Sequence, residues 1–453
     1  MRRAVALVAL GALLVCRPPL RADPGSESLR THASVARPSA ETGASARLRP
    51  ARPDPILAWL RYKAVRIDSL DEGSPPDDLM PISPWIDDAA IVALGDGTHG
   101  TREYYLVKQR IIEFLASSRG SCTVAFEGPW NEFLRIDDYI QGGPGDPDAL
   151  LRIPGYFFWE YEEMRELLEW ARAFNAVRAP AERIELLGLD VYGSVESRDE
   201  VLSFLAMVDP AARETAQKEY GCVGELLGGS ACAPSLDSVR RNLEEKREQY
   251  VASAGLKLYL RALQSARVIE QARDVTQATS FQANQATRDA MMAENARWIQ
   301  DAWLGGKELV VWAHNEHVGK SPWKLFGQDG EVDVESMGLH LKSTFGTSYF
   351  AIGTSMSEGS FIAYNASSSN PVAMQPVTPD NYELLFVRSG HPIQAIPLFG
   401  SDVPDWIKGP RRLRFGTASY WPSEFNNPWI SLPEKFDAII HFDHTTPATP
   451  LPK

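Results

Sequence analysis

Residues 90–103 read AIVALGDGTHGTRE, and this stretch decides the fold. Its first five residues form a short apolar run, which is typical of a strand buried in a parallel sheet. A glycine-rich loop with Asp96 and His99 follows, and then a helix begins whose apolar residues recur at three- and four-residue spacing. A strand, a tight loop and a helix in this order predict a βαβ unit. The apolar stripe of the helix consists of Tyr104, Val107, Ile111 and Phe114.

The same strand pattern recurs along the chain between helical stretches, so we expect an α/β fold with a mainly parallel sheet flanked by helices. A helical pattern fills 196–304, between two of the strands, and predicts a large helical insertion. The sequence leaves open whether this insertion closes over a site as a lid or takes no part in chemistry. The expected strands are 90–94, 123–126, 184–189, 309–312, 349–352 and 438–442.

The chain begins with the features of an export signal. Two arginines precede an apolar run at 4–16, so we expect residues 1–22 to be a signal peptide and the protein to be periplasmic or secreted. Cys16 leaves a lipoprotein as the alternative, although no small residue stands directly before it. Residues 23–54 are rich in Ser, Ala, Pro and Arg and predict a flexible leader, which leaves 55–453 as the α/β domain.

The composition is that of a globular chain with an acidic balance. Hydrophobic residues make up 44% of the 453 residues, and 46 Lys and Arg against 59 Asp and Glu give a formal charge of −13. Removal of residues 1–22 takes away four arginines and no acid, so the mature chain would carry 42 − 59 = −17. Nucleic-acid binding needs a basic surface, so we expect no nucleic-acid partner. We also expect no membrane span after removal of the signal.

Three cysteines remain after the predicted signal. Cys222 and Cys232 bracket a short glycine-rich segment, and in an oxidising compartment this spacing favours a small disulfide loop, with two unpaired thiols as the alternative. Cys122 stands just before an expected strand, which predicts a small buried hydrophobe rather than a nucleophile.

Reactive side chains follow four of the expected strands at the point where each strand ends. Because the carboxyl ends of parallel strands meet at one edge of a sheet, where ligands bind in open α/β folds, we expect these side chains to lie together. The glycines around His99 allow a tight turn, and the helix start after it offers N–H groups to an anion. Thr98 or Thr101 could instead cap that helix. The strand-end residues are Asp96, His99, Glu127, Asp190, His314 and His317.

These residue types predict acid–base catalysis with water as the nucleophile. A histidine takes up a proton near neutral pH, so His99 is the candidate general base. Glu127 would orient that imidazole or share its proton, and His314 would be the second acid–base group for the leaving alkoxide. His317 would position His314. Arg102 would bind a substrate carbonyl or an anionic intermediate, with a surface ion pair as its alternative.

Other chemistries fit the sequence less well. Residues 353–357, GTSMS, lack the second glycine of a Gly-x-Ser-x-Gly elbow, which disfavours a serine nucleophile. The sequence has no Walker loop, and no Gly-x-Gly-x-x-Gly follows the first strand. Residues 314–317, HNEH, differ from the His-Glu-x-x-His of zinc proteases. We expect no cofactor and no required metal, although several histidines and carboxylates leave a zinc-dependent hydrolase as an alternative.

Several motifs of the chain resemble those of the erythromycin esterase family. The likeness is carried by residues 95–103, by Glu127, and by 288–295 and 312–318, and it spans most of the chain after the leader. The segments 337–338, 345–346 and 436–440 extend it. The resemblance implies an α/β esterase, unrelated to the serine hydrolases, in which a histidine activates water to open a macrolide lactone.

Carried over residue by residue, the resemblance places the family's catalytic histidine at His99, its strand-end glutamate at Glu127 and its later histidine pair at His314 and His317. It also places Arg288 and Glu294 near the same site. The alternative for these two residues is a surface ion pair on the helix. The family usually has Glu where this chain has Asp96, and the shorter side chain bears on the role of this acid or on the substrate. We expect the substrate to be bound by Asp96, Arg102, Glu103, Arg288, Glu294 and His317.

The sequence thus predicts an exported hydrolase that cleaves a carboxylic ester, with a macrolide lactone as the candidate substrate. The alternative is a non-catalytic envelope protein that binds a small molecule or saccharide at the same place, for which 12 Trp and 14 Tyr would be suitable. Turnover of an ester separates the two hypotheses.

Overall fold

The structure, a computed structural model, describes residues 54–452 apart from 225–232, 328–329, 366–367 and 415–428. The predicted signal peptide, nearly all of the predicted leader and Cys232 lie outside these residues, so the export signal and the Cys222–Cys232 disulfide stay predictions. Cys122 is buried and unpaired, and burial raises the pKa of its thiol to about 12. Within the described ranges, no helix is long and apolar enough to cross a membrane.

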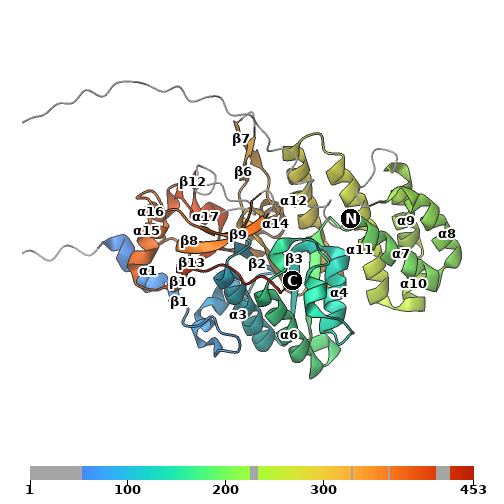
Figure 1. Cartoon of the computed structure of the whole chain (residues 1–453), viewed down its shortest axis with the longest axis horizontal. Coiled ribbons are helices and arrows are strands. Elements are labelled where there is room, and N and C mark those ends of the chain that lie inside the picture. Colours follow the sequence, from blue (N-terminus) through green and yellow to red (C-terminus); the bar gives the residue numbers. More distant parts are fainter. Residues whose placement is uncertain (1–53, 225–232, 328–329, 366–367, 415–428, 453) are drawn as a thin grey trace, which may run out of the picture.

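A nine-stranded sheet forms the centre of the fold (Figure 1). The six predicted strands are its parallel part, in the order β13-β8-β2-β5-β3-β4. At one edge β10 and β1 continue the sheet in antiparallel pairing. The predicted α/β class with a mainly parallel sheet is confirmed. The strands are β1 (Val65–Arg66), β2 (Ile91–Asp96), β3 (Cys122–Pro129), β4 (Ile184–Asp190), β5 (Leu309–His314), β6 (Trp323–Gly327), β7 (Gly330–Val334), β8 (Tyr349–Asn365), β9 (Ser368–Ala373), β10 (Ile393–Pro397), β11 (Arg411–Arg412), β12 (Trp429–Ile430) and β13 (Ala438–Thr445).

Helices cover both faces of the sheet and enclose two apolar cores. Because neighbouring residues of a strand point to opposite faces, Val92 packs with α3 (Arg102–Arg119) and α6 (Glu162–Ala176) in one core, whereas Ala93 packs with α11 (Leu256–Thr276) and α12 (Phe281–Trp298) in the other. The helices outside the insertion are α1 (Pro55–Lys63), α2 (Ser83–Ile86), α3 (Arg102–Arg119), α4 (Trp130–Ile140), α5 (Pro147–Leu151), α6 (Glu162–Ala176), α13 (Asn315–Val318), α14 (Met337–Phe345), α15 (Glu383–Phe386), α16 (Asp405–Lys408) and α17 (Leu432–Lys435).

Helices α7 to α12 follow one another between β4 and β5, which confirms the large helical insertion. Its outer part lies at one end of the molecule (green in Figure 1). Gly255 separates α10 from α11 with a φ of 85°, a backbone conformation that favours glycine. The last helix, α12, packs against β4 and so reaches the sheet. The helices are α7 (Ser194–Val208), α8 (Pro210–Glu219), α9 (Ala233–Glu245), α10 (Arg247–Ala254), α11 (Leu256–Thr276) and α12 (Phe281–Trp298).

Two hairpins that the sequence analysis missed follow strands of the parallel sheet. We expected a strand at 349–352, but β8 continues to Asn365 and pairs with β9. The extension is rich in Ser and Gly, which hides its strand pattern, and it is held by a hydrogen bond from Ile362 N to Gly100 O (2.9 Å). A Cβ at Gly100 would lie 2.2 Å from the Ile362 carbonyl oxygen, so only glycine fits against this strand. The second hairpin is formed by β6 and β7.

Candidate active site

The ends of four parallel strands bring the predicted acids and histidines to one edge of the sheet. Asp96 at the end of β2 is the register partner of His314 at the end of β5. Glu127 lies in β3 on the other side of β5, and its Oε2 accepts a hydrogen bond from the backbone N–H of His314 (2.9 Å). Asp190 is the last residue of β4, next to β3.

Asp96 holds His99 in a single tautomer. Oδ2 of Asp96 lies 2.8 Å from Nδ1 of His99. Since a carboxylate accepts, Nδ1 carries the proton in the neutral form of the ring, and Nε2 is then the acceptor. Burial of Asp96 opposes its ionisation, but Lys108 and His99 together lower the pKa of its carboxyl. The structure thus gives Asp96 the orienting role that we expected of Glu127, whereas we expected Asp96 to bind substrate.

Lys108 is a member of this cluster that the sequence analysis missed. Its buried ammonium forms an ion pair with Asp96 and lies 4.6 Å from the centre of the Trp312 ring. Burial lowers the pKa of Lys108 to about 8, against the opposing effect of Asp96. A signal was present in the sequence, because Lys108 falls on the same helical face as Tyr104 and Ile111. A lysine within an apolar stripe predicts a buried charged partner.

The loop that carries His99 is fixed by its neighbours. The backbone N–H of Gly97 donates to the hydroxyl of Thr354 in β8 (2.7 Å), and the hydroxyls of Thr98 and Thr101 bond to each other. Thr101 stands at the N-cap position of α3, but its side chain does not cap the helix. The Tyr105 hydroxyl lies 2.5 Å from the carbonyl oxygen of His99, which ties α3 to the loop. These contacts preorganise the imidazole.

His314 is held in the opposite tautomer. Its Nδ1 accepts a hydrogen bond from the backbone N–H of Glu316 (3.3 Å), so the ring proton lies on Nε2. Burial, assisted by His99, lowers the pKa of His314 to about 3, and the ring is therefore neutral at physiological pH. The centroids of the His99 and His314 rings are 4.9 Å apart. The two rings are therefore neighbours, and each has a partner on its Nδ1.

Arg288 of α12 joins two of the strand-end carboxylates. Its guanidinium bonds Asp190 through Nε (3.0 Å) and Nη2 (2.5 Å), and it bonds Oε1 of Glu127 through Nη2 (3.0 Å). Burial of Glu127 opposes its ionisation, but His317 and Arg288 hold its pKa well below the usual range. Arg288 is buried here, so the structure does not give it the surface pair considered as its alternative. It fixes the carboxylate that holds His314.

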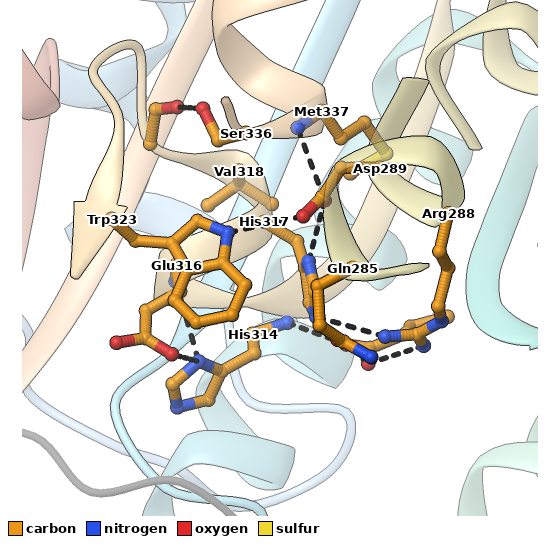
Figure 2. A network of polar contacts seen from close by, with 12 residues as sticks. Gln285, Arg288, Asp289, His314, Glu316, His317, Val318, Trp323, Ser336 and Met337 are labelled. Carbon is orange, nitrogen blue, oxygen red and sulfur yellow. Dashed lines mark hydrogen bonds and ion pairs between the residues drawn. The ribbon is translucent and has the colours of Figure 1, made fainter. Parts of the chain in front are cut away.

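His317 lies beside this network as a cation. Its Nδ1 is 2.6 Å from Oδ1 of Asp289, and its Nε2 is 3.3 Å from Oε1 of Glu127. Asp289 also accepts hydrogen bonds from the Trp323 indole (3.0 Å) and the backbone N–H of Met337 (3.1 Å), as Figure 2 shows. Burial alone would lower the pKa of His317, but Asp289 and Glu127 raise it to about 10. Because it keeps its proton at neutral pH, His317 is suited to hold Glu127.

Three of the expected substrate-binding residues have partners outside the His99 cluster. Arg102 is half-exposed and pairs with Glu163 (3.4 Å). Glu103 accepts hydrogen bonds from the backbone N–H (2.8 Å) and hydroxyl (2.7 Å) of Thr446, near the end of the chain. Glu294 pairs with an arginine of α11 and lines a cavity of about 250 Å³ between α12 and α14. Arg102 and Glu294 therefore form ion pairs, which were the alternatives to substrate binding for these two residues.

A second histidine cluster lies between β8 and β13. Nδ1 of His441 is 3.0 Å from the Ser355 hydroxyl, its Nε2 is 3.0 Å from the Ser357 hydroxyl, and Asp443 is 3.5 Å away. The His441 ring is fully buried, and burial lowers its pKa. These serines belong to the segment that lacks the nucleophile elbow. Both hydroxyls lie inside the strand rather than on a sharp turn.

Metal binding would require several ligands that converge on one point. In the part of the chain that the structure describes, no group of three or more His, Cys, Asp or Glu side chains is arranged to hold a metal ion. The carboxylates of the site are instead paired with Lys108, Arg288 and His317. These pairs fix Asp96 and Glu127, the two carboxylates that contact His99 and His314.

Comparisons with known proteins show the family of this chain. The sequence model of erythromycin esterase matches residues 117–445. An Escherichia coli protein named erythromycin esterase type II is 24% identical over 425 residues, which is 86% of this chain and 97% of that protein. Among solved structures, a succinoglycan biosynthesis protein is 21% identical with a TM-score of 0.76, and covers 90% of this chain and 100% of its own.

A solved structure of an erythromycin esterase mutant in its open conformation is also similar. It is 17% identical, has a TM-score of 0.65, and covers 84% of this chain and 97% of its own. At these identities the solved structures establish the fold alone. The family match covers well over half of the sequence. The chain therefore belongs to the erythromycin esterase family, a family of hydrolases.

Proposed function

We propose that this protein is an exported hydrolase that cleaves a carboxylic ester with water activated by His99, and that a macrolide lactone is its substrate. The observation that carries the proposal is the placement of two imidazoles whose centroids are 4.9 Å apart, with Asp96 on Nδ1 of His99 and the backbone N–H of Glu316 on Nδ1 of His314. Family membership supports ester hydrolysis, and the macrolide rests on the name of the E. coli relative.

The first half of the reaction forms a bond between water and the ester. Nε2 of His99 takes a proton from a water molecule while the water oxygen bonds to the carbonyl carbon. The carbonyl oxygen becomes an oxyanion, and the Nε2–H of His314 donates a hydrogen bond to it. One preorganised donor of this kind contributes about 10²- to 10³-fold in rate. Because His314 is neutral, it suits this role better than the proton-donating role we expected from the sequence.

The second half breaks the bond to the alcohol. The carbonyl re-forms, the C–O bond to the alkoxide breaks, and the imidazolium of His99 returns its proton to the alkoxide. One water is consumed, and an acid and an alcohol are released. The carboxylate of Asp96 stabilises the imidazolium between the two halves, and the ammonium of Lys108 keeps that carboxylate ionised. Glu127 positions His314, because it accepts a hydrogen bond from the backbone N–H of that residue.

The test is to incubate the purified protein with erythromycin and with a panel of simple esters. Mass spectrometry then detects the gain of one water. We expect turnover of at least one ester, and a loss of about 10²- to 10⁴-fold in His99→Ala. If the wild type and His99→Ala turn over the ester equally, the role of His99 is wrong.

The same assay addresses the alternatives. Ligand binding without turnover, unchanged by His314→Ala, would favour a non-catalytic binding protein. Activity that disappears on exhaustive chelation and returns with added zinc would favour a metal-dependent hydrolase. Activity that persists after chelation would support the proposed mechanism.

Export is tested on the full chain expressed with its first residues. If residues 1–22 are a signal peptide, the periplasmic or secreted protein begins after Ala22, and its intact mass identifies that N-terminus. Protein that retains Met1 and stays in the cytoplasm would contradict export. A mass increased by lipid on Cys16 would support the lipoprotein alternative.

A further inference from the structure

A column of aromatic rings extends from His99. Phe158 in the turn Phe157–Trp159 stacks on the His99 ring, with centroids 4.3 Å apart and planes inclined by 15°. Tyr156 stacks on Phe158 in turn, at 4.9 Å and 14°. Tyr192, just beyond the end of β4, meets Tyr156 edge to face at 6.3 Å and 68°. We call Phe158, Tyr156 and Tyr192 the aromatic column.

Exposure increases along the aromatic column from Phe158 to Tyr192. His99 is 9% exposed and Phe158 is 6% exposed, whereas Tyr156 is half-buried and Tyr192 is 37% exposed. Packing of the core accounts for Phe158, but it does not require an exposed aromatic ring at a strand end. The column runs from the ring of His99 to this exposed ring, so a group that packs along it meets aromatic surface.

Polar contacts fix the outer rings of the column before any ligand arrives. The Tyr156 hydroxyl donates to Oδ2 of Asp190 (3.4 Å), and the guanidinium of Arg288 lies 5.6 Å from the centre of the Tyr192 ring. Both partners belong to the network that holds Glu127 and hence His314. Because the rings are already ordered, little entropy is lost when a ligand packs against them.

We propose that the site selects esters whose alcohol carries a ring, and that the aromatic column receives this ring. An aromatic wall binds a flat face well, either the π face of an aryl group or the C–H face of a saturated ring. A linear chain covers less of the wall and loses rotational freedom when it binds. This inference rests on the proposed ester hydrolysis, since it names the substrate class of the same site.

The test compares three acetates whose alcohols have seven carbons and similar leaving-group reactivity: benzyl, cyclohexylmethyl and n-heptyl acetate. We expect kcat/KM to be about two- to tenfold higher for the ring esters, the size of one aromatic contact. Tyr192→Leu should remove this preference, because it should lower kcat/KM for the two ring esters more than for n-heptyl acetate. Preference for benzyl alone would assign π stacking, and preference for both rings would assign the flat C–H face. Either result supports the column.

Matched variants separate selection from structural damage. Tyr192→Phe keeps the ring and should keep the preference. Tyr62→Leu removes a tyrosine that is 83% exposed in α1 and should leave all three esters unaffected. A wild type that favours n-heptyl acetate would overturn the inference. So would a Tyr192→Leu variant that loses activity equally on all three esters.

Failure of the proposed hydrolysis is a distinct result, in which the wild type turns over no ester. The aromatic column is then tested by binding. Saturation-transfer NMR measures the binding of benzyl alcohol, cyclohexylmethanol and n-heptanol. Ring-selective binding that disappears in Tyr192→Leu supports the aromatic column without catalysis. Binding without ring selectivity overturns it.

Discussion

The sheet carries two histidine clusters with similar side chains, and they differ in the atoms left to react. His441 lies within β13, fully buried, with a serine hydroxyl on each ring nitrogen. His99 lies in the loop after β2, and Asp96 occupies only its Nδ1. The first cluster therefore contains Ser, His and Asp side chains, but its serines lie inside a strand and not on the sharp turn that exposes a serine nucleophile. The second is the cluster in which we propose that His99 activates water.

Position at the strand end accounts for this difference. Inside a strand, backbone groups form hydrogen bonds with neighbouring strands and side chains pack in the core, as at Ser355 and His441. A loop at the carboxyl edge instead presents its side chain where a ligand can approach. Residue types therefore identify candidate catalytic residues, whereas their place in the fold and the control of the histidine tautomer decide between the candidates.

The largest expected effect comes from breaking the tautomer control of His99. Asp96→Asn can present an amide N–H to Nδ1 and stabilise the wrong tautomer, so we expect kcat/KM for ester hydrolysis to fall as far as in His99→Ala, by about 10²- to 10⁴-fold. Asp78 provides a matched control, because it forms a buried ion pair with Arg110 (2.9 Å) on the same helix α3. Asp78→Asn should lose stability and keep activity. A retained activity above about a tenth in Asp96→Asn would contradict the account.

The next effect compares the two histidines that stay neutral. His314→Asn removes the proposed hydrogen-bond donor to the oxyanion, and kcat should fall about 10²-fold with little change in KM. His441→Asn is the counterpart in the other cluster and should lower the melting temperature without this loss of kcat. Steady-state kinetics and thermal melts of both variants make the comparison. Equal loss of kcat in both would remove the distinction between the clusters.

A smaller effect is expected in the pH dependence of stability. Asp289 and Glu127 raise the pKa of His317 from 6.5 to about 10, so its stabilising contribution is complete below about pH 6.5 and is lost as the pH rises through about 10. The difference in unfolding free energy between wild type and His317→Gln should therefore shrink by up to roughly 4 kcal/mol between pH 6 and pH 10.5. Urea titrations across this range measure it. A difference that is constant with pH would show that His317 is not charged in the folded protein.

The smallest effect is expected from the serine of the buried cluster. Ser355→Ala leaves Nδ1 of His441 without its hydrogen bond, which costs about 1–3 kcal/mol of stability. Denaturant unfolding measures this cost. A variant as stable as the wild type would mean that the hydroxyl does not bond His441 in solution.

The sequence predicted the elements whose pattern is local and strong. All six parallel strands, the insertion and the strand-end positions of Asp96, Glu127 and His314 follow from apolar runs and from what comes after them. The sequence did not predict which side chains pair when they lie in different elements. Lys108 pairs with a residue twelve positions away in a different element, and Arg288 meets Asp190 across 98 positions. The sequence contains each residue but not the distance between them.

The errors have the same physical cause. We expected Glu127 to orient His99, but spacing along the chain does not show which of two carboxylates faces Nδ1, and the structure places Asp96 there. The continuation of β8 was missed because its partners, β9 and the loop at Gly100, had to be in place first. Glu103 lies beside His99 in the motif, yet its side chain turns to Thr446 near the end of the chain.

The central claim is that His99, and no serine, carries ester hydrolysis. The most direct measurement is kcat/KM of one hydrolysed ester with wild type, His99→Ala and Ser355→Ala, each checked for a folded state by thermal melting. The account predicts a loss of about 10²- to 10⁴-fold in His99→Ala and a rate within about twofold of wild type in Ser355→Ala. A wild-type rate in His99→Ala, or an equal loss in Ser355→Ala, would contradict it.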